Sequence, residues 1–150
     1  ILSGIYTSLC FKDFIKSTGV KKGDFGIEVT ETAELNNLSL ASLRLSSIKN
    51  LGVSIALDDF GAGYSALRYL KDLPIDLLKL DKSFTTEMAE THNQSLIQIA
   101  KLMADSLSME FICEGLEEEW QIEKAISLGC ERGQGYFLHK PCSLEDLTNE

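Results

Sequence analysis

The segment ALDDFGAGYSAL, from Ala56 to Leu67, places two aspartates side by side at the end of an apolar run. Asp58 and Asp59 repel each other when ionised, which indicates that a cation holds them together. Carboxylate oxygens select hard divalent ions such as Mg²⁺ or Mn²⁺. Two such ions about 3.5–4 Å apart are typical of phosphoester hydrolysis. The alternative is that Asp59 only caps the following turn and that Asp58 is its solvated neighbour.

Further ionisable residues follow other apolar runs at similar positions. Glu28, Lys79 and Glu114 each lie near the end of a short run rich in branched or aromatic residues, with Asp81 and Glu117 just beyond two of these runs. Lys79 supplies the positive charge that a phosphate or an activated water requires, and a carboxylate nearby can accept a proton. The alternative for Lys79 is a structural ion pair with Asp81.

The apolar runs themselves have the length and composition of strands. They cover residues 25–31, 53–59, 76–81 and 109–115, with a weaker candidate at 131–137. Because side chains alternate along a strand, each run has one apolar face and a second face with an ionisable group near its C-terminal end. By this parity Asp58 points to the second face, and we expect Asp59 to turn toward the same site because the strand ends there.

Helical patterns lie between these runs. They cover residues 40–48, 96–107 and 120–128, and Ser143–Asp146 resembles a capping box that begins a last helix. A doubly wound sheet is apolar on both faces, whereas a barrel gathers one face of every strand around an axis. We therefore expect an α/β fold, a partial TIM-like (β/α) barrel of about five parallel strands with crossover helices.

Composition limits the remaining options. The 150 residues fit one domain, and 44% hydrophobic and 25% charged residues are typical of a globular protein. A net charge of −9 argues against electrostatic binding of DNA or anionic lipid, and no apolar run approaches the length of a membrane span. The scattered cysteines indicate reduced thiols in a cytoplasmic protein rather than a zinc site or disulfides; they are Cys10, Cys113, Cys130 and Cys142.

Five motifs then match one family. DDFGAGYSAL resembles the DDFGTGYSSL signature of EAL domains, the phosphodiesterases that cleave cyclic di-GMP. LPIDLLKLDKSF, ICEGLEEEWQ and GCERGQGYFLHKP are similar to the family's LPVDxLKIDxSF, xAEGVExxxQ and GCDxxQGYxxxxP, and IEVTE resembles LEITE. The matches keep the family's order over residues 25–147, which makes the resemblance specific.

The resemblance implies roles for the matched residues. The implied metal ligands are Glu28, Asp58, Asp59 and Glu117, for two Mg²⁺ or Mn²⁺ ions. Lys79 is implied to orient the attacking water and Glu114 to act as general base. Gln134 and Asp81 are implied to bind water or substrate, and Glu31 to anchor the loop of residues 60–67, which shapes the metal site and a dimer contact. The implied product is the linear dinucleotide.

The strand that carries the EAL tripeptide in this family has no counterpart here. The chain begins at Ile1, and we expect it to be a truncated EAL domain, with residues 1–24 an N-terminal helical segment and 25–147 the matched barrel portion. We expect this fragment to be weakly active or inactive and to be completed by a homodimer or another segment. In the whole protein, an upstream sensory or GGDEF domain is expected.

Two alternatives remain open. The first is a degenerate, non-catalytic EAL module that binds nucleotide or a partner protein in signalling. The second is an unrelated magnesium barrel of the enolase type, in which acids and a lysine also end successive strands.

Overall fold

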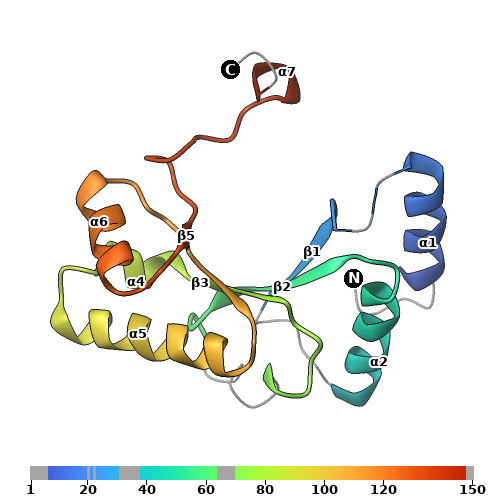
Figure 1. The fold of residues 1–150 in the computed structure, drawn as a ribbon, viewed down its shortest axis with the longest axis horizontal. Helices are drawn as coiled ribbons and strands as arrows, with labels where there is room; N and C mark the ends of the chain where they lie inside the picture. Colours follow the sequence, from blue (N-terminus) through green and yellow to red (C-terminus); the bar gives the residue numbers. More distant parts are fainter. Residues whose placement is uncertain (1–6, 20, 22, 31–37, 64–69, 148–150) are drawn as a thin grey trace.

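A single parallel sheet organises the chain in this computed structural model, which describes residues 7–19, 21, 23–30, 38–63 and 70–147. The strands are β1 (Gly26–Thr30), β2 (Ser54–Phe60), β3 (Leu77–Leu80), β4 (Glu110–Cys113) and β5 (Arg132–Gly133). They lie in the order β1-β2-β3-β4-β5, each parallel to the next. Because the order never reverses, every crossover advances in the same direction, as in a (β/α) barrel and unlike a doubly wound sheet. The sheet remains open between β1 and β5 (Figure 1).

The helices alternate with these strands as the sequence predicts. They are α1 (Thr7–Thr18), α2 (Leu38–Lys49), α4 (Lys82–Thr86), α5 (Thr91–Ser106), α6 (Glu119–Ser127) and α7 (Leu144–Leu147). Gly129 follows α6 with a left-handed φ of 87°, which ends that helix as expected. The five residues of α4 were not predicted, because one turn and a half is too short to show a helical period.

The parity argument correctly identifies the buried face of the sheet. Ile55, Leu57, Leu78 and Leu80 are at most 4% exposed, and they pack beneath the helices in one core. Each such side chain contributes roughly 1.5–3 kcal/mol when it is fully buried. The opposite face carries the ionisable groups and is less covered, so the chemistry lies on the side of the sheet away from the helices.

Two cysteines meet in this core. The sulfur atoms of Cys113 and Cys130 lie 3.2 Å apart, with Cys113 as the donor, and both residues are buried as free thiols. Their separation of 17 residues gave no indication of this contact. Because the Cys113 proton is held by the neighbouring sulfur in a buried setting, the pKa of Cys113 is raised well above its ordinary value.

A bulge interrupts the pairing of β2 with β3 at the aspartate pair. Leu57 pairs with Leu78 and Phe60 with Leu80, so β2 uses one more residue than β3 over this stretch. The expectation that the strand ends at Asp59 is therefore wrong, since β2 continues to Phe60. The bulge and a left-handed φ of 55° at Asp59, a conformation that aspartate tolerates, break the strict alternation instead.

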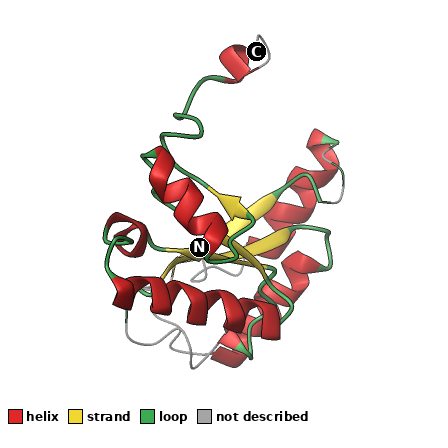
Figure 2. Cartoon of the chain, turned by 60° about the vertical axis from the view of Figure 1, so that its left-hand side comes forward, coloured by secondary structure: helices red, strands yellow, loops and turns green. Residues whose placement is uncertain are grey.

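The C-terminal helix is capped as predicted. The backbone N–H of Asp146 donates to Oγ of Ser143 at 3.2 Å, and the Ser143 hydroxyl donates to the Asp146 carboxylate at 2.7 Å. The first of these hydrogen bonds is the one that the serine makes in a capping box, whereas the second joins the two side chains instead of the Asp146 carboxylate and the backbone N–H of Ser143. The helix α7 stands apart from the sheet (Figure 2).

Candidate functional site

Lys79 lies at the centre of the candidate site. It occupies β3, the middle strand, and only 5% of the residue is exposed. Its Nζ lies 2.8 Å from Glu28 Oε1, 2.9 Å from Asp58 Oδ1 and 2.6 Å from Glu114 Oε1. These partners come from β1, from β2 and from the residue that follows β4. The ammonium group of β3 therefore contacts side chains from β1, from β2 and from the residue after β4 on the face of the sheet that carries the ionisable groups.

The three carboxylates determine the charge of this lysine. Burial by itself lowers the pKa of Lys79, but the attraction of Nζ to the carboxylates of Glu114, Glu28 and Asp58 outweighs it, and the pKa is raised above its ordinary value. Lys79 is consequently a permanent cation at neutral pH, so it acts in the site as a fixed positive charge.

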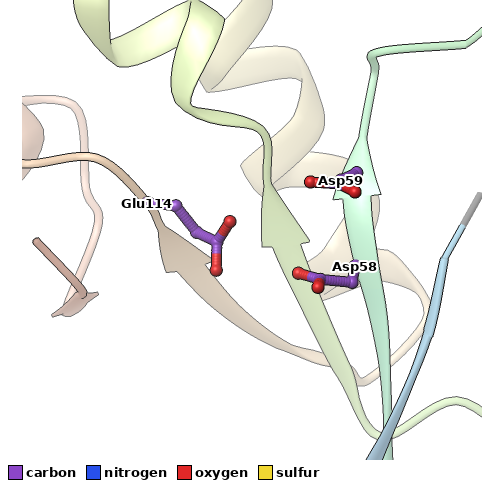
Figure 3. Close-up of side chains that lie close together, drawn as sticks. All are labelled: Asp58, Asp59 and Glu114. Atoms are coloured by element: carbon purple, nitrogen blue, oxygen red, sulfur yellow. The ribbon is translucent and has the colours of Figure 1, made fainter. Parts of the chain in front are cut away.

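Three carboxylates face one another beside this lysine. Oxygen atoms of Asp58, Asp59 and Glu114 all lie within 4.8 Å of one another, and their side chains point into a shared space between β2 and the end of β4 (Figure 3). Burial, followed by repulsion from Asp58 and Asp81, raises the pKa of Asp59. Burial also raises the pKa of Glu114, to which repulsion from Asp58 and Glu28 adds while Lys79 opposes it.

The cluster has the properties of a divalent cation site. Oδ1 of Asp58 is buried and, among the described residues, has no partner in hydrogen-bonding geometry, although Lys79 Nζ lies 2.9 Å away. Three carboxylates contact a single ammonium group and a fourth, that of Asp59, lies beside two of them, so negative charge is in excess. An excess of close carboxylate oxygens suits a hard divalent ion, which makes the donor set compatible with Mg²⁺ or Mn²⁺.

A cavity of about 630 Å³ adjoins this cluster. Glu114, Glu117 and Gln134 line it, so the structure brings these three predicted residues together. The cavity is also lined by residues that the sequence analysis did not select: Lys82, Tyr136, His139 and Lys140. Nζ of Lys140 lies 6.0 Å from the ring centre of Tyr136. Strand parity does not identify these side chains because most of them follow β5, which is only two residues long.

The sequence of this chain matches a known protein family. The family model of the EAL domain matches residues 6–141. This chain belongs to the EAL domain family. Its open sheet is thus part of the TIM-like barrel of an EAL domain, as predicted.

Named relatives and solved structures agree with this assignment. The chain is 35% identical over 136 residues to the cyclic di-GMP phosphodiesterase PdeA of Borreliella burgdorferi, over 87% of this chain and 20% of that protein. It is 41% identical over 123 residues to the signaling protein YkoW of Bacillus subtilis, over 81% of this chain and 15% of that protein. The chain therefore spans a fifth or less of these relatives.

This chain covers a larger share of the solved structures that it superposes on. The EAL domain of Mycobacterium smegmatis DcpA superposes with a TM-score of 0.94 at 30% identity, over 99% of this chain and 67% of that one. The PaMucR phosphodiesterase in its c-di-GMP complex superposes with a TM-score of 0.90 at 29% identity, over 97% of this chain and 60% of that one. No described helix of this EAL domain is long and apolar enough to span a membrane.

The other predicted residues occupy varied places in the EAL domain. The side chain of Glu28 contacts Lys79 but is 55% exposed. Asp81 caps α4, where its Oδ1 accepts from the backbone N–H of Ser83 at 3.0 Å. Lys79 forms ion pairs with three carboxylates from other segments. The alternative interpretation, a structural ion pair between Lys79 and Asp81, is therefore wrong. Glu31 and residues 64–67 of the loop that it is predicted to anchor lie outside the described residues.

Proposed function

We propose that this EAL domain belongs to a phosphodiesterase that opens one phosphodiester bond of cyclic di-GMP and releases the linear dinucleotide. The observation that carries this proposal is the cluster of Asp58, Asp59 and Glu114 beside the buried Lys79. Similarity to proteins named for cyclic di-GMP hydrolysis supports the choice of substrate. The adjoining cavity, which has Lys82 and Lys140 on its wall, suits an anionic ligand.

The metal ligands form the second part of the proposal. Glu28, Asp58, Asp59 and Glu117 would hold two Mg²⁺ or Mn²⁺ ions. When bound, these ions stabilise negative charge on the phosphate and lower the pKa of a water molecule. The excess of carboxylate over ammonium groups in the cluster supports this choice of cofactor, because without a cation the carboxylates repel one another.

Glu114 and Lys79 carry out the proton and charge chemistry in this proposal. A carboxylate oxygen of Glu114 accepts a proton from the attacking water as the water oxygen bonds to phosphorus. The P–O ester bond breaks, and the departing sugar oxygen takes up a proton from solvent water. Lys79, only 2.6 Å from Glu114, orients the water and opposes the growing negative charge. Gln134, on the wall of the cavity, and Asp81 contact water or substrate.

The test is turnover of cyclic di-GMP by the whole protein in the presence of Mn²⁺, with the linear dinucleotide quantified by chromatography. Glu114→Gln is the matched control, because it keeps the side-chain size and removes the proton acceptor. We expect at least about a hundredfold loss of kcat in this variant, as is typical for loss of a positioned acid–base group. Equal rates for the unchanged protein and Glu114→Gln would contradict the role of Glu114. No turnover by the unchanged protein would contradict the enzyme assignment.

One observation favours a second candidate, a non-catalytic EAL module that binds nucleotide. The sheet is not closed, and 55% of the Glu28 side chain is exposed to solvent. Equilibrium dialysis with cyclic di-GMP separates the two candidates, since the module binds nucleotide without converting it. We further propose that the protein acts in cytoplasmic signalling, as a homodimer or with its barrel completed by another segment, downstream of a sensory or GGDEF domain.

A further inference from the structure

The two glutamates that line the cavity lie on a segment without regular structure. β4 ends at Cys113 and α6 begins at Glu119, so Glu114 and Glu117 both belong to the connecting loop of residues 114–118. A loop of this kind holds a side chain in place only if other elements fix its backbone. We infer that Gln121 and Thr85 are positioning residues that fix this loop and thereby place Glu114 and Glu117. This inference rests on the proposed function.

Gln121 fixes the second half of the loop. It lies in the first turn of α6 and is only 6% exposed. Its Oε1 accepts hydrogen bonds from the backbone N–H groups of Glu117 at 2.7 Å and Glu118 at 2.9 Å. Its Nε2 donates to the backbone carbonyl of Thr85 in α4, at 3.1 Å. One buried amide therefore ties the backbone of Glu117 to a different helix.

Helix capping accounts for only part of this arrangement. A glutamine at this position of a helix normally accepts from the N–H of the capping residue, here Glu118. Capping requires neither the contact with Glu117 nor the donation from Nε2 to Thr85. These two hydrogen bonds connect α6, the loop and α4, which indicates a role in holding the loop rather than only in beginning the helix.

Thr85 fixes the first half of the loop. The residue is fully buried, and its hydroxyl lies 2.5 Å from the carbonyl oxygen of Glu114 and 2.8 Å from that of Lys82. The contact with Lys82 is the local one that threonine often makes within a helix. A single hydroxyl proton serves both acceptors, so Thr85 links the peptide group of Glu114 directly to α4.

The opposite side of the loop is held by the β5 segment. The N–H of Leu116 donates to the carbonyl of Gln134 at 3.1 Å, and the N–H of Phe137 donates to the carbonyl of Leu116 at 3.0 Å. The loop is therefore fixed on two sides, by α4 and α6 on one side and by the residues that follow β5 on the other. A displacement near 1 Å at a reacting group costs up to about a hundredfold in rate, so this support bears directly on Glu114.

Thr85→Val tests the contact with Glu114, because valine keeps the shape of threonine and lacks the hydroxyl. In the whole protein with Mn²⁺ and cyclic di-GMP, we expect kcat to fall about tenfold with KM unchanged. Thr85→Ser keeps the hydroxyl and should recover most of this loss. A Thr85→Val variant with the kcat of the unchanged protein, or a Thr85→Ser variant as impaired as valine, would overturn the inference for Thr85.

Gln121→Met tests the contact with Glu117. We expect about a tenfold weaker affinity for Mn²⁺, measured by the free-ion signal in electron paramagnetic resonance, because Glu117 is no longer held. Gln121→Glu restores an acceptor for the N–H groups of Glu117 and Glu118 and should recover part of the affinity. Leu45→Ala, on the buried face of α2, is the control for general destabilisation and should leave Mn²⁺ affinity unchanged. An equal loss in Leu45→Ala and Gln121→Met would overturn the inference for Gln121.

The two readouts separate this inference from the proposed function. If the unchanged protein binds Mn²⁺ but does not hydrolyse cyclic di-GMP, the proposed function fails, and the Gln121 variants still decide the inference through metal affinity. If the unchanged protein hydrolyses cyclic di-GMP, and the Thr85 and Gln121 variants have the same kcat and the same Mn²⁺ affinity as that protein, only the inference fails. A protein that neither binds Mn²⁺ nor turns over substrate overturns both.

Discussion

Lys79 determines the balance of charge at the site. It contacts Glu28, Asp58 and Glu114 while being almost fully buried itself. Strand parity predicts that these groups share one face, since each follows an apolar run at the same phase. The sequence does not show that all three carboxylates converge on one ammonium group, because that convergence depends on the register between neighbouring strands.

Replacing Lys79 by methionine should affect stability and activity together. Buried carboxylates without their cation repel one another, so we expect Lys79→Met to lower the free energy of unfolding by about 3 kcal/mol. Mn²⁺ should recover more stability in this variant than in the unchanged protein, since the ion replaces the missing charge. Urea unfolding with and without Mn²⁺ measures both effects.

Lys101 provides the control for this substitution. It pairs with Asp105 on the surface of α5, four residues away, at 2.6 Å. Exposed pairs of this type contribute at most about 1 kcal/mol, so Lys101→Met should change stability little and should show no special response to Mn²⁺. Similar results for the two lysine variants would contradict the central role of Lys79.

Glu114 should make the stability of the metal-free protein depend on pH. Its pKa is raised above the ordinary value of 4.5, mainly by burial, so the folded state binds this proton more tightly than the unfolded state. Stability then falls as pH rises above 4.5 and levels off once the folded state has also lost the proton. Relative to Glu114→Gln, the melting temperature of the unchanged protein should decrease over this range, and saturating Mn²⁺ should abolish the decrease. A melting temperature that rises with pH relative to that of Glu114→Gln would contradict the raised pKa.

At the scale of elements, the strand and helix pattern was more predictable than its irregularities. The four longer strands and the apolar face of each were correct because alternation and branched residues are local signals. The bulge at Asp58 and Asp59 was missed, since a bulge is defined by pairing with β3 rather than by the residues of β2 alone. A similar reason hides the contact of Thr85 with Glu114 and that of Gln121 with Thr85, which join residues 29 and 36 positions apart in the chain.

Gly135 is required by a close approach between two elements. A Cβ atom at this position would lie 2.0 Å from the carbonyl oxygen of Leu116, in the loop that carries Glu114 and Glu117. We expect Gly135→Ala to lower the free energy of unfolding by about 1–3 kcal/mol and to weaken Mn²⁺ binding, because the loop must move.

Gly129 offers a comparison for this prediction. A Cβ there meets no atom within 4 Å, although its φ of 87° strains any other residue. Gly129→Ala should therefore cost about 1 kcal/mol through the backbone alone and leave Mn²⁺ affinity unchanged. Thermal unfolding together with a Mn²⁺ titration separates the two cases. Equal Mn²⁺ affinity in both alanine variants would argue against the close approach at Gly135.

At the scale of the whole molecule, the open sheet is the main structural fact. β1 pairs with β2 on one side, and no strand in the described part of the chain pairs with its other side. A closed TIM barrel has no such edge, and an exposed strand edge promotes association. We therefore expect residues 1–150 to self-associate as concentration increases, as measured by sedimentation velocity. A monomer at all concentrations tested would contradict this expectation.

Closure of the sheet should also determine activity. The chain spans 67% of the Mycobacterium smegmatis EAL domain that it superposes on, so a protein extended to at least that length is the appropriate comparison. We expect the extended protein to hydrolyse cyclic di-GMP with Mn²⁺ and residues 1–150 alone to do so negligibly, because a strand added beside β1 would cover Glu28, whose side chain is 55% exposed to solvent. Turnover of both proteins is measured beside Glu114→Gln in the extended form. Equal turnover by the 150-residue chain would show that its five strands already hold every group the reaction needs.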